Sequence, residues 1–349
     1  MDKLRSIWST RQLTNDGAFV RELEEGIART VGVRHAVFVS NGTIAIQFAL
    51  RAVGVRGRVV TTPFSYVATT AALVWEGLEP AFADIELESL TIDPSHTDTL
   101  LAAGASGVLA THVYGNPCDV DALESLGRRY QVPIVYDAAH AFGALFRGRS
   151  LCAYGSAATL SFHATKLFHT VEGGAVVTDD DAVAEAVRRL RNFGQSGPDQ
   201  IEGLGINGKN SEIHAAMGLC LLPRLPDIIR DRTALATCYT AHIADLAPVV
   251  RPIVWRHGTV PNYSYFPVIF STEAALLRCM DVLEAADIRA RRYFRPSLSL
   301  LPYVSHSATT PISDSAADRV LCLPLYPGLG MDSVKRIALL LRQAVATPL

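Results

Sequence analysis

Between residue 19 and about residue 180, the hydrophobic positions alternate between two spacings. Residues 19–32 carry apolar side chains at helical spacing and end at Gly32, which predicts a helix. Short and nearly continuous apolar runs follow, and such runs are typical of buried strands. The runs lie at residues 35–40, 57–63, 79–85, 107–115, 132–139 and 158–163, with helical patterns at 44–54 and 120–130 between some of them. The alternation predicts a mostly parallel sheet covered by helices on both faces.

The pattern changes after this region. Residues 192–210 are polar and rich in glycine, and they interrupt the alternation. Helical spacing then returns, and one strand and two helices are predicted near the end of the chain. These segments are 211–225, 227–246, 263–270, 272–286 and 332–346. The predicted fold class is α/β, with a large domain at residues 1–235 and a smaller C-terminal α+β domain at residues 236–349.

The composition excludes several classes of partner. The 349-residue chain is 49% hydrophobic and 19% charged, so it can bury a large core and has apolar surface left for a subunit interface. Its formal net charge of −2 removes the electrostatic basis for binding nucleic acid. No apolar run approaches the roughly 20 residues of a membrane span, and residues 1–17 lack the apolar core of a signal peptide. We therefore expect a cytoplasmic protein that binds neither nucleic acid nor membranes.

The cysteines give no indication of a metal site. Six of them are scattered along the chain without a CxxC pair or a His/Cys ligand spacing. We interpret them as small buried side chains in a reducing compartment, and we expect no bound metal.

Lys166 is the main candidate for chemistry. It follows Ser161 by five residues in LSFHATKLFHTVEGG and has apolar neighbours on both sides. A lysine forms the Schiff base of pyridoxal phosphate (PLP) enzymes and then acts as a general base, provided that desolvation and the cationic ring lower its pKa. The alternative is a solvated surface amine, but the apolar neighbours favour a site.

Three further side chains are candidates to contact a planar cofactor. Asp137 ends the apolar run VPIVYD, where α/β sheets carry ligands, and a protonated pyridine ring would supply the cation that a buried carboxylate needs. A helix cap is the structural alternative for Asp137. His140 either reaches the same ligand or packs in the core. Tyr66 precedes a helical run of small residues, where its ring either lies flat on the cofactor or packs internally.

The segment Ser40-Asn41-Gly42-Thr43 lies between a strand and a helix. Such a turn offers free backbone N–H groups and a hydroxyl to a phosphate at the positive end of the helix. An ordinary helix N-cap is the alternative explanation. Ser161, at another strand end, would add a hydroxyl to this phosphate seat.

A glycine-rich segment suggests a different class of enzyme. GLGING, with Gly203, Gly205 and Gly208, matches the dinucleotide pattern GxGxxG, and Asp227 lies about 20 residues beyond. That motif requires a preceding buried strand, whereas the preceding residues here form a polar loop. An NAD-dependent oxidoreductase is therefore the weaker hypothesis.

Segments from residue 12 to about residue 330 resemble the DegT-type nucleotide-sugar aminotransferases, which are PLP enzymes of fold type I. The matching segments include SNGT, TPFSYVAT, YDAAHAFGA, SFHATKLFHTVEGG, GINGKNSEIHAAMGL and RRYFRPSL. The combination Asp…Ser-x-x-x-x-Lys…Glu-Gly-Gly carries most of the resemblance. It implies a large PLP-binding domain with a mostly parallel sheet, followed by a smaller domain.

The resemblance also implies roles for individual residues. Lys166 would form the Schiff base with PLP, and Asp137 would bind the pyridine nitrogen, while His163 would lie beside the reacting atoms. In this family the G-x-N-x-(K/R) segment crosses from the neighbouring subunit, so Lys209 should reach the phosphate of the partner's cofactor. The active unit would then be a homodimer with shared sites. The remaining cofactor contacts would come from Gly42, Thr43, Tyr66, His140 and Ser161.

Enzymes of this family aminate a keto sugar carried on a nucleoside diphosphate and usually take the nitrogen from L-glutamate. Arg291, Arg292 and Tyr293 are the candidates for substrate contacts. Four arginines in this segment either bind the diphosphate or form a solvated basic face. They are Arg289, Arg291, Arg292 and Arg295. Relatives often have Tyr where this chain has Arg295.

The position of amination is less strongly indicated. The string FHATKxFxTxEGG resembles enzymes that convert dTDP-4-keto-6-deoxy-D-glucose to dTDP-4-amino-4,6-dideoxy-D-glucose. Carbon-three aminotransferases on dTDP-3-keto-6-deoxy sugars more often carry Asp in place of Glu172, and they are the first alternative. A non-catalytic regulatory protein with the same fold is another. Relatives with histidine in place of the lysine act as dehydratases, and Lys166 argues against that activity.

Overall fold

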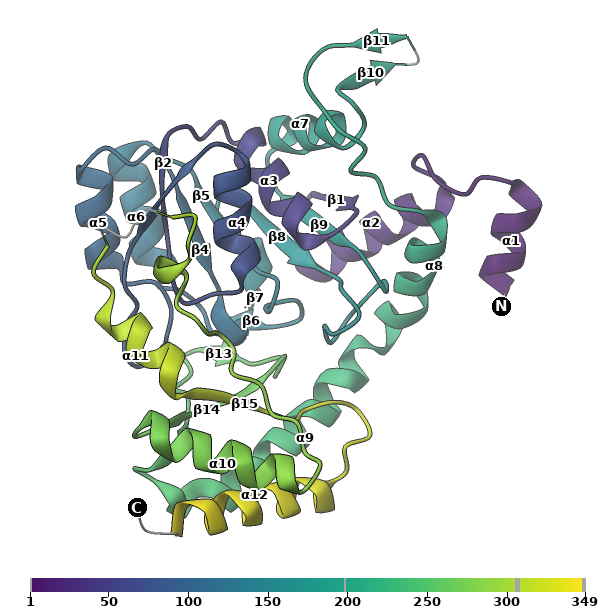
Figure 1. The fold of residues 1–349 in the computed structure, drawn as a ribbon. Helices are drawn as coiled ribbons and strands as arrows, with labels where there is room; N and C mark the ends of the chain where they lie inside the picture. The colour runs from purple at the N-terminus through teal and green to yellow at the C-terminus, as the bar shows by residue number, and fades with distance from the viewer. Residues whose placement is uncertain (1, 198, 305–307, 347–349) are drawn as a thin grey trace.

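The computed structural model describes residues 2–197, 199–304 and 308–346 of the chain (Figure 1). Its largest sheet has seven strands in the order β1-β9-β8-β5-β4-β2-β3. β9 is antiparallel to both of its neighbours, and all other pairs are parallel. The strands are β1 (His35–Val39), β2 (Arg58–Thr61), β3 (Glu79–Phe82), β4 (Val108–Thr111), β5 (Ile134–Asp137), β8 (Ala157–Ser161) and β9 (Gly174–Thr178).

The prediction of a mostly parallel α/β sheet is confirmed. β9 is not among the predicted strands, because no helix separates it from β8 and it returns antiparallel after the loop that holds Lys166. Helices cover both faces of the sheet, as predicted (Figure 1). One face carries α3 (Gly42–Ala52), α4 (Val67–Trp75) and α7 (Asp181–Arg191), and the other carries α2 (Ala18–Val31), α5 (Pro94–Ala102), α6 (Val120–Tyr130) and α8 (Glu212–Leu221).

Both faces of the central strands are buried, which explains why their sequences read as continuous apolar runs. Along β5, Val135 packs into the core under α3 and α4, whereas Ile134 and Tyr136 pack into the core on the opposite face.

The C-terminal part has its own sheet and core. β12 (Val250–Pro252), β14 (Phe266–Phe270) and β15 (Val320–Leu323) form a three-stranded antiparallel sheet that packs with α9 (Leu225–Ile243), α10 (Glu273–Ala285) and α12 (Met331–Ala346). The predicted boundary at residue 235 falls inside α9. Leu225 at its start belongs to the core of the large sheet, and Leu235 belongs to the C-terminal core. The division into domains 1–235 and 236–349 therefore stays a prediction.

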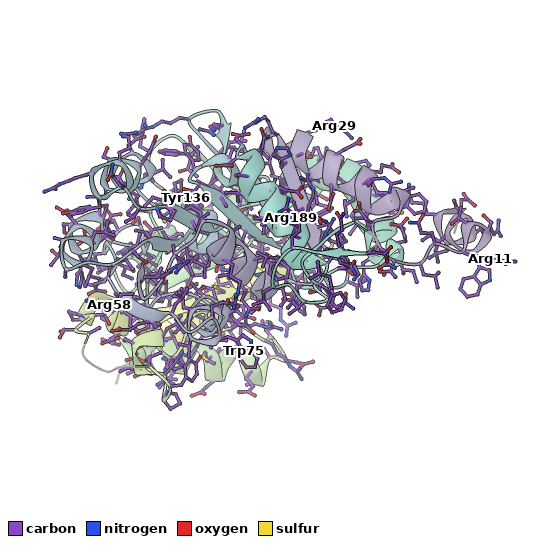
Figure 2. The ribbon with its side chains drawn as sticks, turned by 90° about the horizontal axis from the view of Figure 1, so that it is seen from above. Arg11, Arg29, Arg58, Trp75, Tyr136 and Arg189 are labelled. Atoms are coloured by element: carbon purple, nitrogen blue, oxygen red, sulfur yellow. The ribbon has the colours of Figure 1, made fainter. Side chains whose placement is uncertain are left out.

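The remaining elements lie at the edges of these two cores. The hairpin β10–β11 projects away from the large sheet (Figure 1). Arg11, which follows α1, lies at one end of the molecule when it is seen from above, away from Tyr136 in the large sheet (Figure 2). The elements outside the two cores are α1 (Asp2–Thr10), β6 (Leu145–Phe146), β7 (Arg149–Ser150), β10 (Gln195–Gly197), β11 (Gln200–Ile201), β13 (Thr259–Val260), α11 (Pro311–Arg319) and short 3₁₀ turns at Val113–Gly115, Leu151–Ala153, Leu222–Arg224, Ala244–Leu246 and Leu298–Leu300.

The described ranges contain neither a helix that could span a membrane nor a cluster of side chains that could bind a metal. No helix within them combines the length and the apolar composition that crossing a membrane requires. Nor do those residues include a cluster of three or more His, Cys, Asp or Glu side chains that could hold a metal ion.

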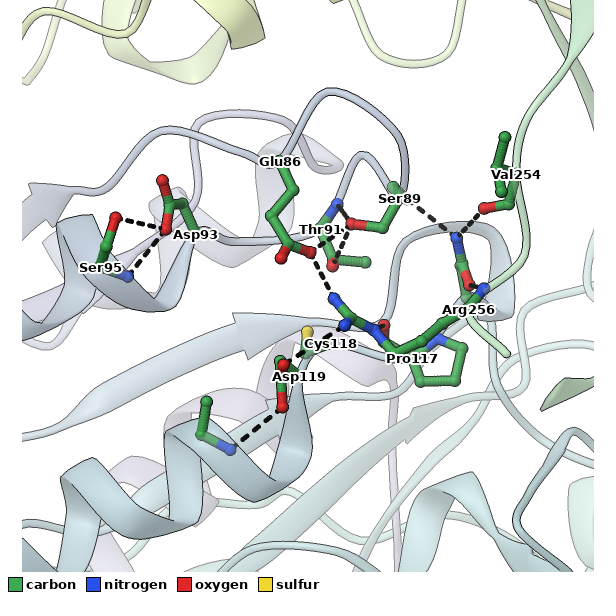
Figure 3. Close-up of polar contacts among 12 residues, drawn as sticks. Glu86, Ser89, Thr91, Asp93, Ser95, Pro117, Cys118, Asp119, Val254 and Arg256 are labelled. Atoms are coloured by element: carbon green, nitrogen blue, oxygen red, sulfur yellow. Dashed lines mark hydrogen bonds and ion pairs between the residues drawn. The ribbon is translucent and has the colours of Figure 1, made fainter. Parts of the chain in front are cut away.

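Polar contacts attach the C-terminal part to the loops of the large sheet. The guanidinium of Arg256 lies between Glu86 and Asp119, and its Nε donates to the carbonyl oxygen of Pro117 at 3.1 Å (Figure 3). The side-chain amide of Asn262 is fully buried and donates to the carbonyl oxygens of His140 and Phe142, each at 2.9 Å. These contacts fix the residues before β14 against the loops that follow β3, β4 and β5.

Glu212 connects two helices that are far apart in the sequence. Its carboxylate is 3% exposed and accepts hydrogen bonds from the backbone N–H groups of Phe19 and Val20, both at 2.9 Å. It thereby caps the N-terminus of α2, where a negative charge is favourable. Gly17 leaves room for it, because a Cβ at this position would lie 2.3 Å from Cδ of Glu212.

We predict that Glu212→Ala lowers the free energy of unfolding by about 3 kcal/mol, because two N–H groups lose a charged acceptor. The midpoint of urea unfolding, followed by circular dichroism, measures the change. Glu88 is exposed, so Glu88→Ala is the control and should change the free energy by less than about 0.5 kcal/mol. Equal shifts in the two variants would contradict the capping role.

Candidate active site

The carboxyl ends of β1, β5 and β8 lie at one edge of the large sheet, as parallel strand directions require. They open into a cavity of about 360 Å³ around Lys166, which we call the Lys166 cavity. Most of the predicted site residues line it, although they come from separate segments of the chain. They are Gly42, Thr43, Tyr66, Asp137, His140, Ser161, His163, Lys166, Arg291 and Tyr293.

Asp137 is the last residue of β5 and is 4% exposed. Its carboxylate accepts hydrogen bonds from Oγ1 of Thr69 at 2.7 Å and from the N–H of Ala139 at 3.2 Å. Burial raises the pKa of Asp137, while these hydrogen bonds and the charge of Lys166 oppose the rise. Sequence reasoning missed Thr69, because a threonine within a helix usually bonds to a carbonyl of its own helix.

Lys166 lies in the loop between β8 and β9, and its Nζ donates to Oη of Tyr265 at 3.2 Å. Burial lowers the pKa of Lys166 to about 8, and the negative charge of Asp137 opposes this shift. The uncharged fraction of the amine near neutral pH is therefore larger than for an ordinary lysine. Sequence reasoning missed Tyr265, which lies 99 residues away and reaches the cavity only because β14 packs beside it.

The start of α3 is the segment predicted to hold a phosphate. The side chain of Asn41 caps the helix by accepting from the N–H of Ile44 at 2.9 Å. The N–H groups of Gly42 and Thr43 lie in the first turn, where a helix provides no acceptor for them. Ser161 closes the seat, and a Cβ on residue 42 would lie only 2.8 Å from Cβ of Ser161. Only glycine therefore permits this close approach, and a small anion fits the donors.

His140 belongs to an aromatic wall of the cavity. Its ring is 2% exposed and stacks on Phe294 with centroids 5.4 Å apart and planes 8° apart. The edge of the wall is Tyr265, whose ring centroid lies 5.0 Å from that of His140. Nδ1 of His140 accepts from the N–H of Tyr114 at 3.2 Å. Burial lowers the pKa of His140 well below its ordinary value, so this ring stays neutral.

The rim of the cavity carries the more exposed side chains. Tyr66 is 53% exposed and precedes α4, with its ring centroid 6.4 Å from that of Phe294. His163 is exposed, and its Nε2 lies 3.5 Å from a carboxylate oxygen of Glu172. Arg291 donates from Nη1 to Oη of Tyr293 at 2.6 Å, also at the rim.

Two predicted site residues do not line the Lys166 cavity. Nζ of Lys209 donates to Oδ1 of Asn192 at 2.9 Å, on a different surface of the same chain. Arg292 is held by Glu273 at 2.7 Å and by Asp318 at 3.5 Å, between α10 and α11. Nothing in this geometry supports a substrate contact for Arg292, because two carboxylates already compensate its charge.

The GLGING segment lacks the context of a dinucleotide site. The strand before it, β11, has two residues and belongs to the projecting hairpin rather than to the large sheet. α8 begins only at Glu212, so no buried strand leads through this loop into a helix.

Known proteins share both the sequence and the fold. The model of the DegT/DnrJ/EryC1/StrS aminotransferase family matches residues 1–342. A dTDP-4-amino-4,6-dideoxy-D-glucose transaminase of Shigella dysenteriae is 36% identical over 346 residues, which cover 97% of this chain and 94% of that protein.

Two solved structures extend the comparison. The structure of DesI in the presence of its TDP-sugar product has a TM-score of 0.93 and 36% identity, covering 99% of this chain and 89% of that chain. The structure of S. venezuelae DesV in complex with a ketimine intermediate has a TM-score of 0.93 and 29% identity, covering 99% and 94%. The similarity therefore includes both the large sheet and the C-terminal part.

We predict that Asp137→Asn lowers the pKa of Lys166 below about 8, because a negative charge that favours the ammonium form is removed. The measurement is the pH dependence of Lys166 acylation by a small amine-reactive reagent, read by mass spectrometry on ligand-free protein. Glu172→Gln is the control, since Glu172 lies at the rim and is not a cause of the shift. A pKa that stays the same or rises in Asp137→Asn would contradict the prediction.

Proposed function

The chain belongs to the DegT/DnrJ/EryC1/StrS aminotransferase family, and we propose that it transfers the amino group of L-glutamate to carbon four of dTDP-4-keto-6-deoxy-D-glucose. It is a PLP-dependent aminotransferase of nucleotide-linked sugars. The product would be dTDP-4-amino-4,6-dideoxy-D-glucose, which appears in the name of the Shigella relative. The observation that carries the proposal is the grouping of a partly buried lysine, a buried carboxylate and a helix-end anion seat in one cavity.

The residues of the Lys166 cavity fit PLP. We propose that the N–H groups of Gly42 and Thr43 and the hydroxyl of Ser161 hold the phosphate, because the glycine at position 42 leaves these donors accessible at a helix N-terminus. Asp137 would bind the pyridine nitrogen, whose positive charge compensates the cost of burying that carboxylate. Tyr66 would cover the ring from the rim of the cavity.

Bound PLP supplies an electron-withdrawing ring, which makes the carbon that carries the amino group more acidic. We propose that Lys166 binds the cofactor and then moves the proton at this carbon. Its lowered pKa suits this role, because a base with a pKa near the working pH exists in both protonation states. The hydroxyl of Tyr265 holds Nζ of Lys166 in place at 3.2 Å.

The two histidines of the site would have different tasks. His140 is neutral and buried, so it would form an apolar wall beside the cofactor without adding a second positive charge. His163 is exposed at the rim, where we propose that it contacts the reacting sugar. Arg291 and Tyr293, which are hydrogen-bonded to each other, would contact the substrate from the C-terminal part.

We also propose a homodimer in the cytoplasm. Lys209 lies outside the Lys166 cavity of its own chain, which is consistent with a contact to the cofactor phosphate of a partner subunit. All six cysteines are free, as expected in a reducing compartment.

Purified protein with PLP should show a visible absorbance band that L-glutamate bleaches. Lys166→Ala should abolish that band and reduce turnover by about a thousandfold or more, because it removes both the covalent anchor and the base. Lys335→Ala, on the surface helix α12, is the control and should behave like wild type. A protein that stays colourless with PLP, or a band that no amino donor bleaches, would contradict the proposed function and favour a non-catalytic role.

The position of amination is tested by the product of the same reaction. We expect NMR of the product to place nitrogen on carbon four after incubation with dTDP-4-keto-6-deoxy-D-glucose and L-glutamate. Nitrogen on carbon three, formed from a dTDP-3-keto-6-deoxy sugar, would replace this proposal with the alternative.

Sharing of the site between subunits predicts complementation. Lys166→Ala and Lys209→Ala subunits, each inactive alone, should recover about a quarter of wild-type activity when co-expressed. Half of the dimers are then mixed, and each mixed dimer has one site with both lysines intact. If Lys209 served the site of its own chain, the mixture would stay inactive.

A further inference from the structure

A second cavity of about 600 Å³ adjoins the Lys166 cavity. We call it the second cavity. Its lining comes from α9, from the loop after β15 and from the residues around Lys166. The two cavities meet where residues line both of them, so a molecule in the second cavity can extend to the reactive amine. The shared residues are Thr165, Lys166, Tyr265, Arg291 and Tyr293.

The charges of the two cavities differ. The Lys166 cavity contains the carboxylates of Asp137 and Glu172. The lining of the second cavity contains no aspartate or glutamate among the described residues, although several cationic side chains face it. They are Lys166, Arg224, Arg232, Arg289 and Arg291. A cavity with this lining concentrates anions.

Arg232 is the most unusual of these cations. It lies on α9, is 5% exposed, and its Nη1 donates to the carbonyl oxygens of Tyr263 and Ser264 at 3.0 and 3.2 Å. Its Nε is buried without a hydrogen-bond partner, and in the described ranges no carboxylate forms an ion pair with it. Burial lowers the pKa of Arg232 to about 10, which reflects how poorly its charge is compensated.

Arg191 is another buried arginine of this chain, and unlike Arg232 it has carboxylate partners. Arg191 is 6% exposed, almost as buried as Arg232, but it pairs with Glu24 at 2.5 Å and with Asp16 at 3.2 Å. A buried cation without such a partner is costly, and a bound anion would remove much of that cost. The contrast indicates that Arg232 receives its counter-ion from a ligand.

We propose that the second cavity binds the acidic amino donor and that Arg232 binds its side-chain carboxylate. This inference rests on the proposed use of L-glutamate. The carboxylate beside the reacting amine must stay near Lys166, and Arg291 lines both cavities at that junction. Arg232 lines only the second cavity, which places it farther along the donor, where glutamate carries its second charge.

The first experiment compares two donors that differ in this charge. Bleaching of the visible band by L-glutamate or L-glutamine is measured for wild type, Arg232→Gln and Arg230→Gln. We expect Arg232→Gln to raise the L-glutamate concentration for half-maximal bleaching about 10- to 100-fold and to change the value for L-glutamine less than about 3-fold. Arg230, exposed on the same helix, is the matched control and should leave both values unchanged.

Retention of the visible band shows that Arg232→Gln is folded, and Arg232→Lys, which keeps the charge, should recover part of the preference for L-glutamate. An unchanged ratio between the two donors in Arg232→Gln would overturn the proposal and leave Arg232 a structural contact to Tyr263 and Ser264. A defect confined to the half-reaction with the sugar nucleotide would also overturn it, since the cavity would then bind the diphosphate.

The second experiment does not depend on turnover. Calorimetry measures binding of glutarate, a dicarboxylate without an amino group, to the PLP-loaded protein. We expect binding to wild type and Arg230→Gln and at least about 10-fold weaker binding to Arg232→Gln. Binding of inorganic pyrophosphate is measured in the same way. Absence of glutarate binding to wild type, or tighter binding of pyrophosphate than of glutarate, would overturn the proposal. If Arg232→Gln weakens glutarate binding but no amino donor bleaches the band, the result supports the anion site and contradicts the proposed function.

Discussion

The site depends on keeping one amine largely out of water without giving it a carboxylate partner. Lys166 and Asp137 line the same cavity, yet the described structure contains no ion pair between them. A direct pair would hold the lysine in its charged form. Instead, Nζ of Lys166 donates to the neutral hydroxyl of Tyr265, and burial lowers its pKa to about 8. The amine therefore remains available for chemistry, while Asp137 remains available for the cofactor ring.

The position of Tyr265 is a result of contacts between distant segments. Asn262 bonds to the carbonyl oxygens of His140 and Phe142, and Arg256 is clamped by carboxylates from the loops after β3 and β4. Further along, Asp84 accepts hydrogen bonds from the N–H groups at the start of α11. The contacts of Asn262 and Asp84 are buried and those of Arg256 are partly buried, so losing one leaves polar groups unpaired, and the C-terminal part is held to the large sheet in one arrangement.

The distribution of charge divides the space around Lys166 in two. The Lys166 cavity has carboxylates that suit a cationic ring, and the second cavity has only cationic ionised side chains in its described lining. The reactive amine lies where these two regions meet. The proposed amino donor is anionic, and an anion-attracting cavity beside Lys166 would concentrate it near the site of reaction.

The sequence by itself determined the mostly parallel sheet and the grouping of Asp137, Ser161 and Lys166, because apolar periodicity defines strands and strand ends of parallel sheets share one edge. It did not indicate that Thr69 bonds to Asp137, that Tyr265 bonds to Lys166, or that Arg232 lacks a carboxylate partner among the described residues. Thr69 meets Asp137 across 68 residues of chain, Tyr265 meets Lys166 across 99, and Arg232 meets Tyr263 and Ser264 across 31 and 32, and local spacing carries no record of such contacts. The sequence also made Arg292 a candidate for a substrate contact, and the structure shows that this guanidinium has two carboxylate partners. Burial and compensation of charge are properties of the folded neighbourhood, so only the tertiary structure decided them.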